Sequence, residues 1–188
     1  MKKIIVATVF VLLSFSVKSQ NASVEDHVFG VQTGFLGLYF HGETKLSDKF
    51  ALRGELGLDF GFWERGIYQD NRGFLLTPVI VIEPRFYYNL EKRVKKSKRI
   101  DGNSGNFISI KTSFNPDLFT ISSDQNVSII PTLQIVPTWG IRRNLGKHFN
   151  YETGIGIGYY KEFYKQNGYS SNESGTAINL HLRIGYRF

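Results

Sequence analysis

The residues from Leu180 to Phe188 constrain the fold more than any other part of this chain. Large apolar side chains occupy every second position, and polar residues or glycine lie between them: Leu180, Leu182, Ile184, Tyr186 and Phe188 against His181, Arg183, Gly185 and Arg187. A period of two indicates an extended strand, because successive side chains of a strand point to opposite faces. One face of this strand is therefore apolar throughout, and the other is polar.

Five further stretches alternate in the same way. They run from Phe50 to Phe62, Phe74 to Leu90, Phe107 to Phe114, Ile129 to Arg142 and Tyr151 to Tyr160. Each reaches or approaches the roughly 9 to 11 residues that a tilted strand needs to cross a bilayer. Beyond the first residues, no segment reaches the ~18 consecutive apolar residues of a transmembrane helix, which excludes a helical membrane protein.

The stretch from Val28 to Glu43 is harder to interpret, because its apolar phase shifts. Phe29, Val31 and Phe35 are at odd positions, whereas Leu36, Leu38 and Phe40 are at even ones. A β-bulge near Gly34 or Gly37 would produce this shift within one strand. A hairpin would give two strands, each too short to span a bilayer. One strand here makes seven in total, but bacterial single-chain barrels have even numbers, so we expect eight strands.

The first nineteen residues have the pattern of a secretory signal peptide. Lys2 and Lys3 precede a mostly apolar run, and cleavage is expected before Gln20. Removing residues 1–19 lowers the formal charge from +7 to +4 and leaves one domain, residues 20–188. The sequence has no cysteine, which excludes a lipoprotein anchor, disulfides and thiolate metal sites.

The connections between the strands are of two kinds. Residues 44–49 and 144–148 are short and turn-like, whereas 63–72, 115–126 and 165–175 are longer and polar. In outer-membrane barrels the periplasmic turns are short and the outer loops are long. The three polar stretches are therefore expected outside the cell, and residues 91–106 on the periplasmic side, where they are long for that role.

Alternation alone does not separate a membrane barrel from a soluble barrel of the lipocalin type, but three features favour lipid outside and a polar lumen. The apolar faces carry residues too bulky for a small lumen. Trp and Tyr gather near the predicted strand ends, as in interfacial girdles: Trp63, Tyr87, Tyr88, Trp139, Tyr151, Tyr159, Tyr160 and Tyr186. The polar faces carry charges that can pair inside: Arg53, Glu55, Asp59, Glu83, Arg85, Lys111, Arg142, Glu152, His181 and Arg183. The predicted fold is an all-β, antiparallel, up-and-down transmembrane β-barrel of eight strands.

The chain after residue 27 resembles the small outer-membrane β-barrel proteins of Gram-negative bacteria, of the OmpA/OmpX type. The resemblance rests on the signal peptide, the alternating strands, the turns at 45–50 and 144–149, and the final Phe188. It implies location in the outer membrane, with lipid and lipopolysaccharide as surroundings. It also implies that the barrel-assembly machinery recognises Leu180, Leu182, Ile184, Tyr186 and Phe188 as an assembly signal. The family has structural, adhesive and enzymatic members, so the resemblance alone assigns no activity.

Motifs for chemistry are weak. His27, His41, His148 and His181 show no metal-binding spacing, and no Ser–His–acid set is recognisable, although such sets are spatial rather than sequential. Gly154, Gly156 and Gly158 lie within a strand and are interpreted as small lumen-facing residues, not a phosphate cradle. No catalytic residue, metal site or cofactor is predicted.

The strongest local feature is a basic turn: Lys92, Arg93, Lys95, Lys96, Lys98 and Arg99. A solvated turn explains it best, a patch for lipid phosphates is the alternative, and nucleic acid is poorly placed to meet it. We therefore expect a structural or surface-interaction role without an open pore. A narrow channel and an enzyme that modifies lipid A or phospholipid are the alternatives.

Overall fold

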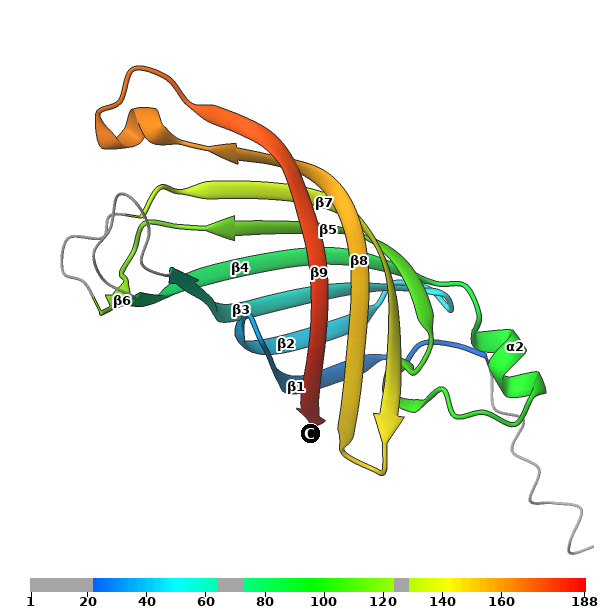
Figure 1. The fold of residues 1–188 in the computed structure, drawn as a ribbon. Coiled ribbons are helices and arrows are strands. Elements are labelled where there is room, and N and C mark those ends of the chain that lie inside the picture. Colours follow the sequence, from blue (N-terminus) through cyan, green and yellow to red (C-terminus); the bar gives the residue numbers. More distant parts are fainter. Residues whose placement is uncertain (1–21, 64–72, 124–128) are drawn as a thin grey trace, which may run out of the picture.

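The computed structural model describes residues 22–63, 73–123 and 129–188, and within them the chain forms an all-β antiparallel barrel (Figure 1). The strands are β1 (His27–Gly34), β2 (Gly37–Lys45), β3 (Phe50–Trp63), β4 (Gly73–Tyr87), β5 (Asn106–Asn115), β6 (Ile121–Ser122), β7 (Thr132–Leu145), β8 (Phe149–Glu162) and β9 (Glu173–Arg187). The short helices are α2 (Leu90–Lys95), η2 (Asp101–Asn103) and η3 (Tyr164–Asn167). The predicted signal peptide lies outside the described residues.

The barrel closes through eight strands. Neighbours follow the chain from β1 to β5 and then through β7, β8 and β9, and β9 pairs with β1 from Gly34↔Arg183 to Gly30↔Arg187. The two-residue strand β6 is an addition that pairs with the upper end of β4. The predicted all-β antiparallel barrel of eight strands is thus confirmed. We call the end at which β9 finishes the lower end, and the opposite end the upper end.

The stretch from Val28 to Glu43 forms a hairpin of two strands, one of the two interpretations that its shifted apolar phase allowed, and the bulged single strand is excluded. Gly34 pairs with Gly37, and Phe35 and Leu36 make a two-residue turn between β1 and β2. Such a turn pairs odd with even positions, which explains why the apolar phase switches there. The strands have 8 and 9 residues, whereas β3, β4, β7, β8 and β9 have 14 or 15.

The barrel has its apolar side chains outside and its charged side chains inside. On β3, Leu56 is 62 % exposed, while its neighbour Glu55 is 2 % exposed. On β9, Leu180 is 65 % exposed, while Arg183 is 5 % exposed. The pleat explains the arrangement, since alternate residues face alternate sides. The inner surface of the described barrel is thus largely polar and ionic, and its outer surface is apolar.

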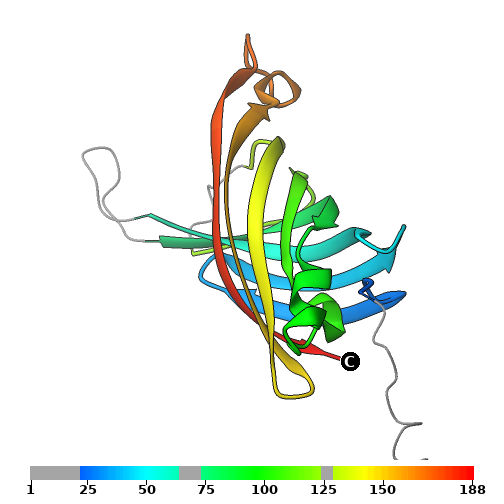
Figure 2. The ribbon, with the colours of Figure 1, turned by 90° about the vertical axis from the view of Figure 1, so that its right-hand side faces the viewer.

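The lower end is covered by the connection between β4 and β5, which contains α2 and η2 (Figures 1 and 2). Its Leu90 and Ile100 pack with Ala51, Tyr87 and Phe107 in a small apolar cluster. The sequence interpretation of residues 91–106 as a turn at the C-terminal end was right about the end but missed this folded structure. Among the described residues, no helix is long and apolar enough to cross a membrane.

Candidate functional site

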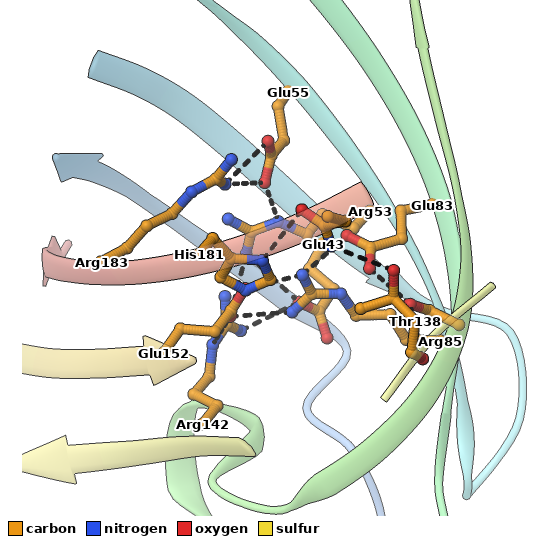
Figure 3. Close-up of polar contacts among 12 residues, drawn as sticks. Glu43, Arg53, Glu55, Glu83, Arg85, Thr138, Arg142, Glu152, His181 and Arg183 are labelled. Carbon is orange, nitrogen blue, oxygen red and sulfur yellow. Dashed lines mark hydrogen bonds and ion pairs between the residues drawn. The ribbon is translucent and has the colours of Figure 1, made fainter. Parts of the chain in front are cut away.

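Glu152 on β8 is the centre of a buried ionic network in the lumen (Figure 3). Arg85 donates hydrogen bonds to both of its carboxylate oxygens, at 2.8 and 2.9 Å, and Arg142 donates one at 2.9 Å. The Nε2 atom of His181 lies 3.6 Å from the same carboxylate. These residues come from β4, β7, β8 and β9, so the network ties distant strands together across the lumen.

Glu43 on β2 continues the network toward the lower end. Its carboxylate accepts hydrogen bonds from Arg142 at 2.9 Å, from the hydroxyl of Tyr87 at 2.8 Å and from the amide of Asn103 at 2.7 Å. Asn103 belongs to η2, so the lower connection is anchored directly to the lumen charges. The backbone N–H of Glu25 also donates to the Asn103 side chain, at 2.7 Å.

Glu55 on β3 forms the upper part of the network. It accepts from Arg53 on its own strand and from Arg183 of β9, whose contacts with both oxygens measure 3.0 Å. The guanidinium of Arg183 also lies 3.8 Å from the centre of the Tyr39 ring, in a cation–π contact. Arg183 is thereby held from two sides.

Charge balance makes this buried network possible. Among the described residues, the fully buried charges are Glu43, Glu55, Glu83 and Glu152 against Arg53, Arg85, Arg142 and Arg183. Removing eight charges from water is costly unless each is paired and hydrogen-bonded. Glu83 accepts hydrogen bonds from Arg85 and Ser109. With the contacts given above for Glu43, Glu55 and Glu152, each of these four carboxylates therefore accepts at least two hydrogen bonds. The arrangement holds the strands together and leaves no free reactive carboxylate.

The structure brings together most of the charges that the sequence predicted for the lumen. Arg53, Glu55, Glu83, Arg85, Arg142, Glu152, His181 and Arg183 contact one another in the network. Asp59 and Lys111 lie apart from it, in the cavity described below. The sequence prediction did not include four further members of the network, which are Glu43, Tyr87, Asn103 and Gln32, whose side-chain oxygen accepts from Arg53 at 2.7 Å. Glu43 shares the inward phase with His41 on β2, so the alternation within this strand is a signal that could have found it.

Gly154 shows why small residues are needed on the inner face. A side chain there would collide with the ring of His181, so the glycine leaves the space that this ring occupies. His41 lies in a similar position over Gly30, and neither of its ring nitrogens has a hydrogen-bond partner among the described residues. No Ser–His–acid arrangement accompanies either histidine in the contacts of the described chain.

Above the network lies a cavity of about 750 Å³. Inward side chains line it, among them Tyr39, Asp59, Val81, Lys111 and Arg183. Outward residues of the wall line it too: Phe35, Leu36, Phe60, Ile178, Leu180 and Leu182. The cavity therefore reaches from the lumen to the outer apolar surface.

In the basic turn, the two arginines make hydrogen bonds within the lower connection, whereas the four lysines are exposed. Arg93 donates to the backbone oxygen of Arg99 at 2.7 Å, and Arg99 donates to both oxygens of Asp101 at 2.6 and 2.8 Å. The lysines Lys92, Lys95, Lys96 and Lys98 are exposed. Arg99 holds the pKa of Asp101 below its ordinary value through this hydrogen bond, against the opposing effect of partial burial.

The prediction that Tyr87 belongs to an aromatic girdle was wrong. Tyr87 is fully buried and points into the lumen, where it contacts Glu43 and Phe107. Trp139 and Tyr88 do lie outside, joined by a hydrogen bond of 2.8 Å from the indole N–H to the phenol oxygen. Tyr186 is also outside and contacts the rings of His148, Phe149 and Phe188.

Comparison with known proteins adds nothing to this geometry, because no family model, curated protein or solved structure matches the chain. Within the described residues, no group of three or more His, Cys, Asp or Glu side chains could hold a metal ion.

Proposed function

We propose that this protein is an integral outer-membrane barrel with a structural or surface-interaction role and no open pore. The observation that carries the proposal is the distribution of polarity, since large apolar side chains cover the outside while the buried interior is ionic. Among the exposed residues are Phe40, Ile82, Ile110, Ile157 and Leu182, from five different strands. A continuous apolar exterior of this kind fits lipid as the surrounding solvent.

A soluble barrel of the lipocalin type is the main alternative, and its polarity would be reversed. Such a barrel keeps an apolar ligand cavity inside and presents polar residues to water. Here the inside holds Glu152 between Arg85 and Arg142, and outward positions such as Leu56 and Ile178 are more than half exposed. In water this surface would aggregate, so the membrane is the environment that suits it.

The lower lumen supports a barrel without a pore. Arg53, Arg85 and Arg142 are almost completely buried there, and the connection from Asn89 to Gly105 packs beneath them. A barrel of eight strands has an interior that side chains can fill. A narrow channel would need a path for water through this network. The contacts among these buried arginines, their carboxylates and the lower connection occupy that part of the lumen in the described residues.

Cell fractionation tests the proposal. The protein should stay with the outer membrane after a carbonate wash, and it should migrate faster on gels when unheated, as folded barrels do. Recovery as a soluble periplasmic protein would overturn the proposed location. Planar-bilayer recording of the refolded protein tests the pore separately, because a steady ohmic conductance would favour the channel.

A further inference from the structure

The barrel wall has a gap on one side of its upper half. β1 pairs with β9 only from Arg183 to Arg187, so residues 173–182 of β9 pair with β8 alone among the described strands. On the other side, β2 ends its pairing with β3 at Asp59, and the turn at Phe35 and Leu36 lies between. Figure 2 shows the upper parts of the β3–β4 and β8–β9 pairs pointing in different directions.

The gap lies within the apolar surface of the barrel. Phe35 at the hairpin turn is 85 % exposed, and Ile178 on the free edge of β9 is 71 % exposed. A turn that ended in water would expose polar residues, whereas this one exposes a phenyl ring and Leu36. An unpaired strand edge at membrane depth is tolerated only where it lines a cavity or is covered by protein. The 750 Å³ cavity lies along this edge, next to Leu180 and Leu182.

Lys111 supplies a positive charge inside this cavity. It lies on β5, across the barrel from the gap in the order of the strands, and pairs in register with Val136. Among the described residues it has no ion pair and no hydrogen bond from its ammonium group. The acids around it are already engaged, since Glu55 accepts from Arg53 and Arg183, and Glu83 from Arg85 and Ser109.

Asp59, the remaining acid of the cavity, is engaged as well. One of its oxygens accepts from the hydroxyl of Tyr39 at 2.8 Å, and the other accepts from the amide of Asn115 at 2.9 Å. The strands on either side of Lys111 line the cavity with Val79, Val81 and Val136, and polar side chains such as Gln134 and Asn179 line it as well. The cavity thus joins an ammonium group at its inner end to an apolar opening at the membrane surface.

We propose that this cavity binds a single-chain amphiphile with an anionic head group, which enters sideways through the gap. The head group pairs with Lys111, and the acyl chain lies over the valines and passes between Phe35 and Leu182. The volume falls in the range of about 300–1,000 Å³ that is usual for small-molecule sites. The inference rests on the proposed membrane location, since the gap opens to lipid only there.

Binding to the refolded barrel in phosphatidylcholine nanodiscs tests the proposal. The probes are palmitate, hexadecyl phosphate, neutral hexadecanol and cationic hexadecyltrimethylammonium, each competing with a fluorescent fatty acid. Either anion should bind at least about tenfold tighter than the alcohol, because a charge-assisted contact is gained. Whichever of the two anions binds with the higher affinity identifies the carboxylate or the phosphate as the preferred head group. Equal affinity for all four probes, or no binding by a barrel that is folded on gels, would overturn the proposal.

Variants locate the site. Lys111→Met should weaken binding of the anions about tenfold and leave the alcohol unchanged. Val136→Phe, which fills the cavity, should weaken every probe. Lys98→Met is the matched control, because Lys98 is exposed on the lower connection. Unchanged anion binding in Lys111→Met, or an equal loss in the Lys98 control, would contradict the assigned site.

The sideways route has its own test. Phe35→Asp places a negative charge at the hairpin turn and should slow the association of palmitate severalfold. Phe119→Asp, in the upper connection between β5 and β6, is the control, since Phe119 is also exposed but does not line the cavity. Equal association rates in the two variants would contradict entry through the gap. Membrane insertion is scored separately by the heat-dependent gel shift, so a failure of binding is distinct from a failure of the proposed location.

Discussion

At the scale of single residues, the lumen charges should dominate stability. Glu152 accepts hydrogen bonds from two arginines, whereas Glu83 accepts from one arginine and Ser109. Glu152→Gln should therefore cost up to about 3–5 kcal/mol of unfolding free energy, because it leaves two buried guanidinium groups without their shared anion. Glu83→Gln should cost less, and lumen water would reduce both values. Urea unfolding in detergent micelles measures the difference.

The control for these variants is Glu173→Gln, since Glu173 is exposed at the upper end of β9. It should change the free energy of unfolding by less than about 0.5 kcal/mol. Equal, small effects of all three substitutions would mean that the network does not stabilise the barrel.

Asp101 gives the lower connection a dependence on acid pH. Its pKa in the folded protein is lowered by the hydrogen bond from Arg99, with further help from Arg187 and Asn144. A lowered pKa means that the carboxylate stabilises the fold above its unfolded pKa of about 3.9 and loses this contribution as the pH falls through the folded value. The difference in thermal unfolding between wild type and Asp101→Asn should therefore be largest at pH 6 and should shrink as the pH falls below about 3.9. A constant difference across that range would show that Asp101 acts by packing alone.

Sequence alternation predicted most of the lumen charges because strand pleating alone decides which side chains share a face. It could not place Tyr87, since a tyrosine near a strand end suits a membrane interface as well as a buried hydrogen bond. The hydrogen bond to Glu43 decides between these environments, and it joins side chains of β2 and β4, the two neighbours of β3, in a contact that the linear sequence does not show.

At the scale of elements, the β1–β2 hairpin depends on Gly37. This residue has φ of +148°, and a Cβ there would collide with the carbonyl oxygen of Leu58. Gly37→Ala should therefore cost about 1–3 kcal/mol through backbone strain, measured by urea unfolding in detergent. Gly54→Ala on β3 is the matched control, since no atom lies within 4 Å of a Cβ built there, and its effect should stay below about 1 kcal/mol.

A second prediction at this scale concerns the proposed assembly signal. Phe188 is 73 % exposed, contacts the Tyr186 ring and donates its backbone N–H to the oxygen of Phe29 at 3.1 Å. If the ring is recognised during assembly, Phe188→Ala should reduce insertion into the outer membrane and leave export intact. Phe35→Ala serves as the control, because Phe35 is also exposed on the outer surface but lies in the β1–β2 turn, far along the chain from the C-terminal strand. Normal insertion of Phe188→Ala would show that the Phe188 ring is not needed for recognition during assembly.

The strands were more predictable than the elements that break their regularity. β3 and β5 lie within one residue of their predicted bounds, because alternation continues through both. The sequence left a bulged strand and a hairpin as alternatives for Val28 to Glu43, because two strands within this stretch would be short for spanning a bilayer. The two strands are indeed short, at 8 and 9 residues, and the hairpin therefore leaves the gap beside β9. The lower connection was missed because its lysines suggested a solvated turn and concealed Leu90 and Ile100, which pack inward.

At the scale of the whole molecule, the barrel separates two surfaces: the apolar faces lie outside, where we propose that they contact lipid, and the ionic faces contact each other inside. The ionic network, the covered lower end and the gap in the wall follow the same division. The lumen is closed below by packed side chains and holds the cavity above the ionic network. A barrel so arranged fits a role at the membrane surface or in binding a lipid-like molecule better than a role in conduction.

Spin labelling along β5 tests this assignment most directly. The sequence contains no cysteine, so Ile108→Cys and Ile110→Cys report the outer face, and Ser109→Cys and Ser113→Cys report the inner face, without any background label. In membranes, labels at Ile108 and Ile110 should be accessible to oxygen and protected from a water-soluble nickel reagent. The label at Ser109 should be protected from both, and the label at Ser113, which lines the cavity, should be less accessible to oxygen than those at Ile108 and Ile110. Access of the nickel reagent to positions 108 and 110, with oxygen access at 109 equal to that at 108 and 110, would contradict the assignment of the apolar faces to lipid.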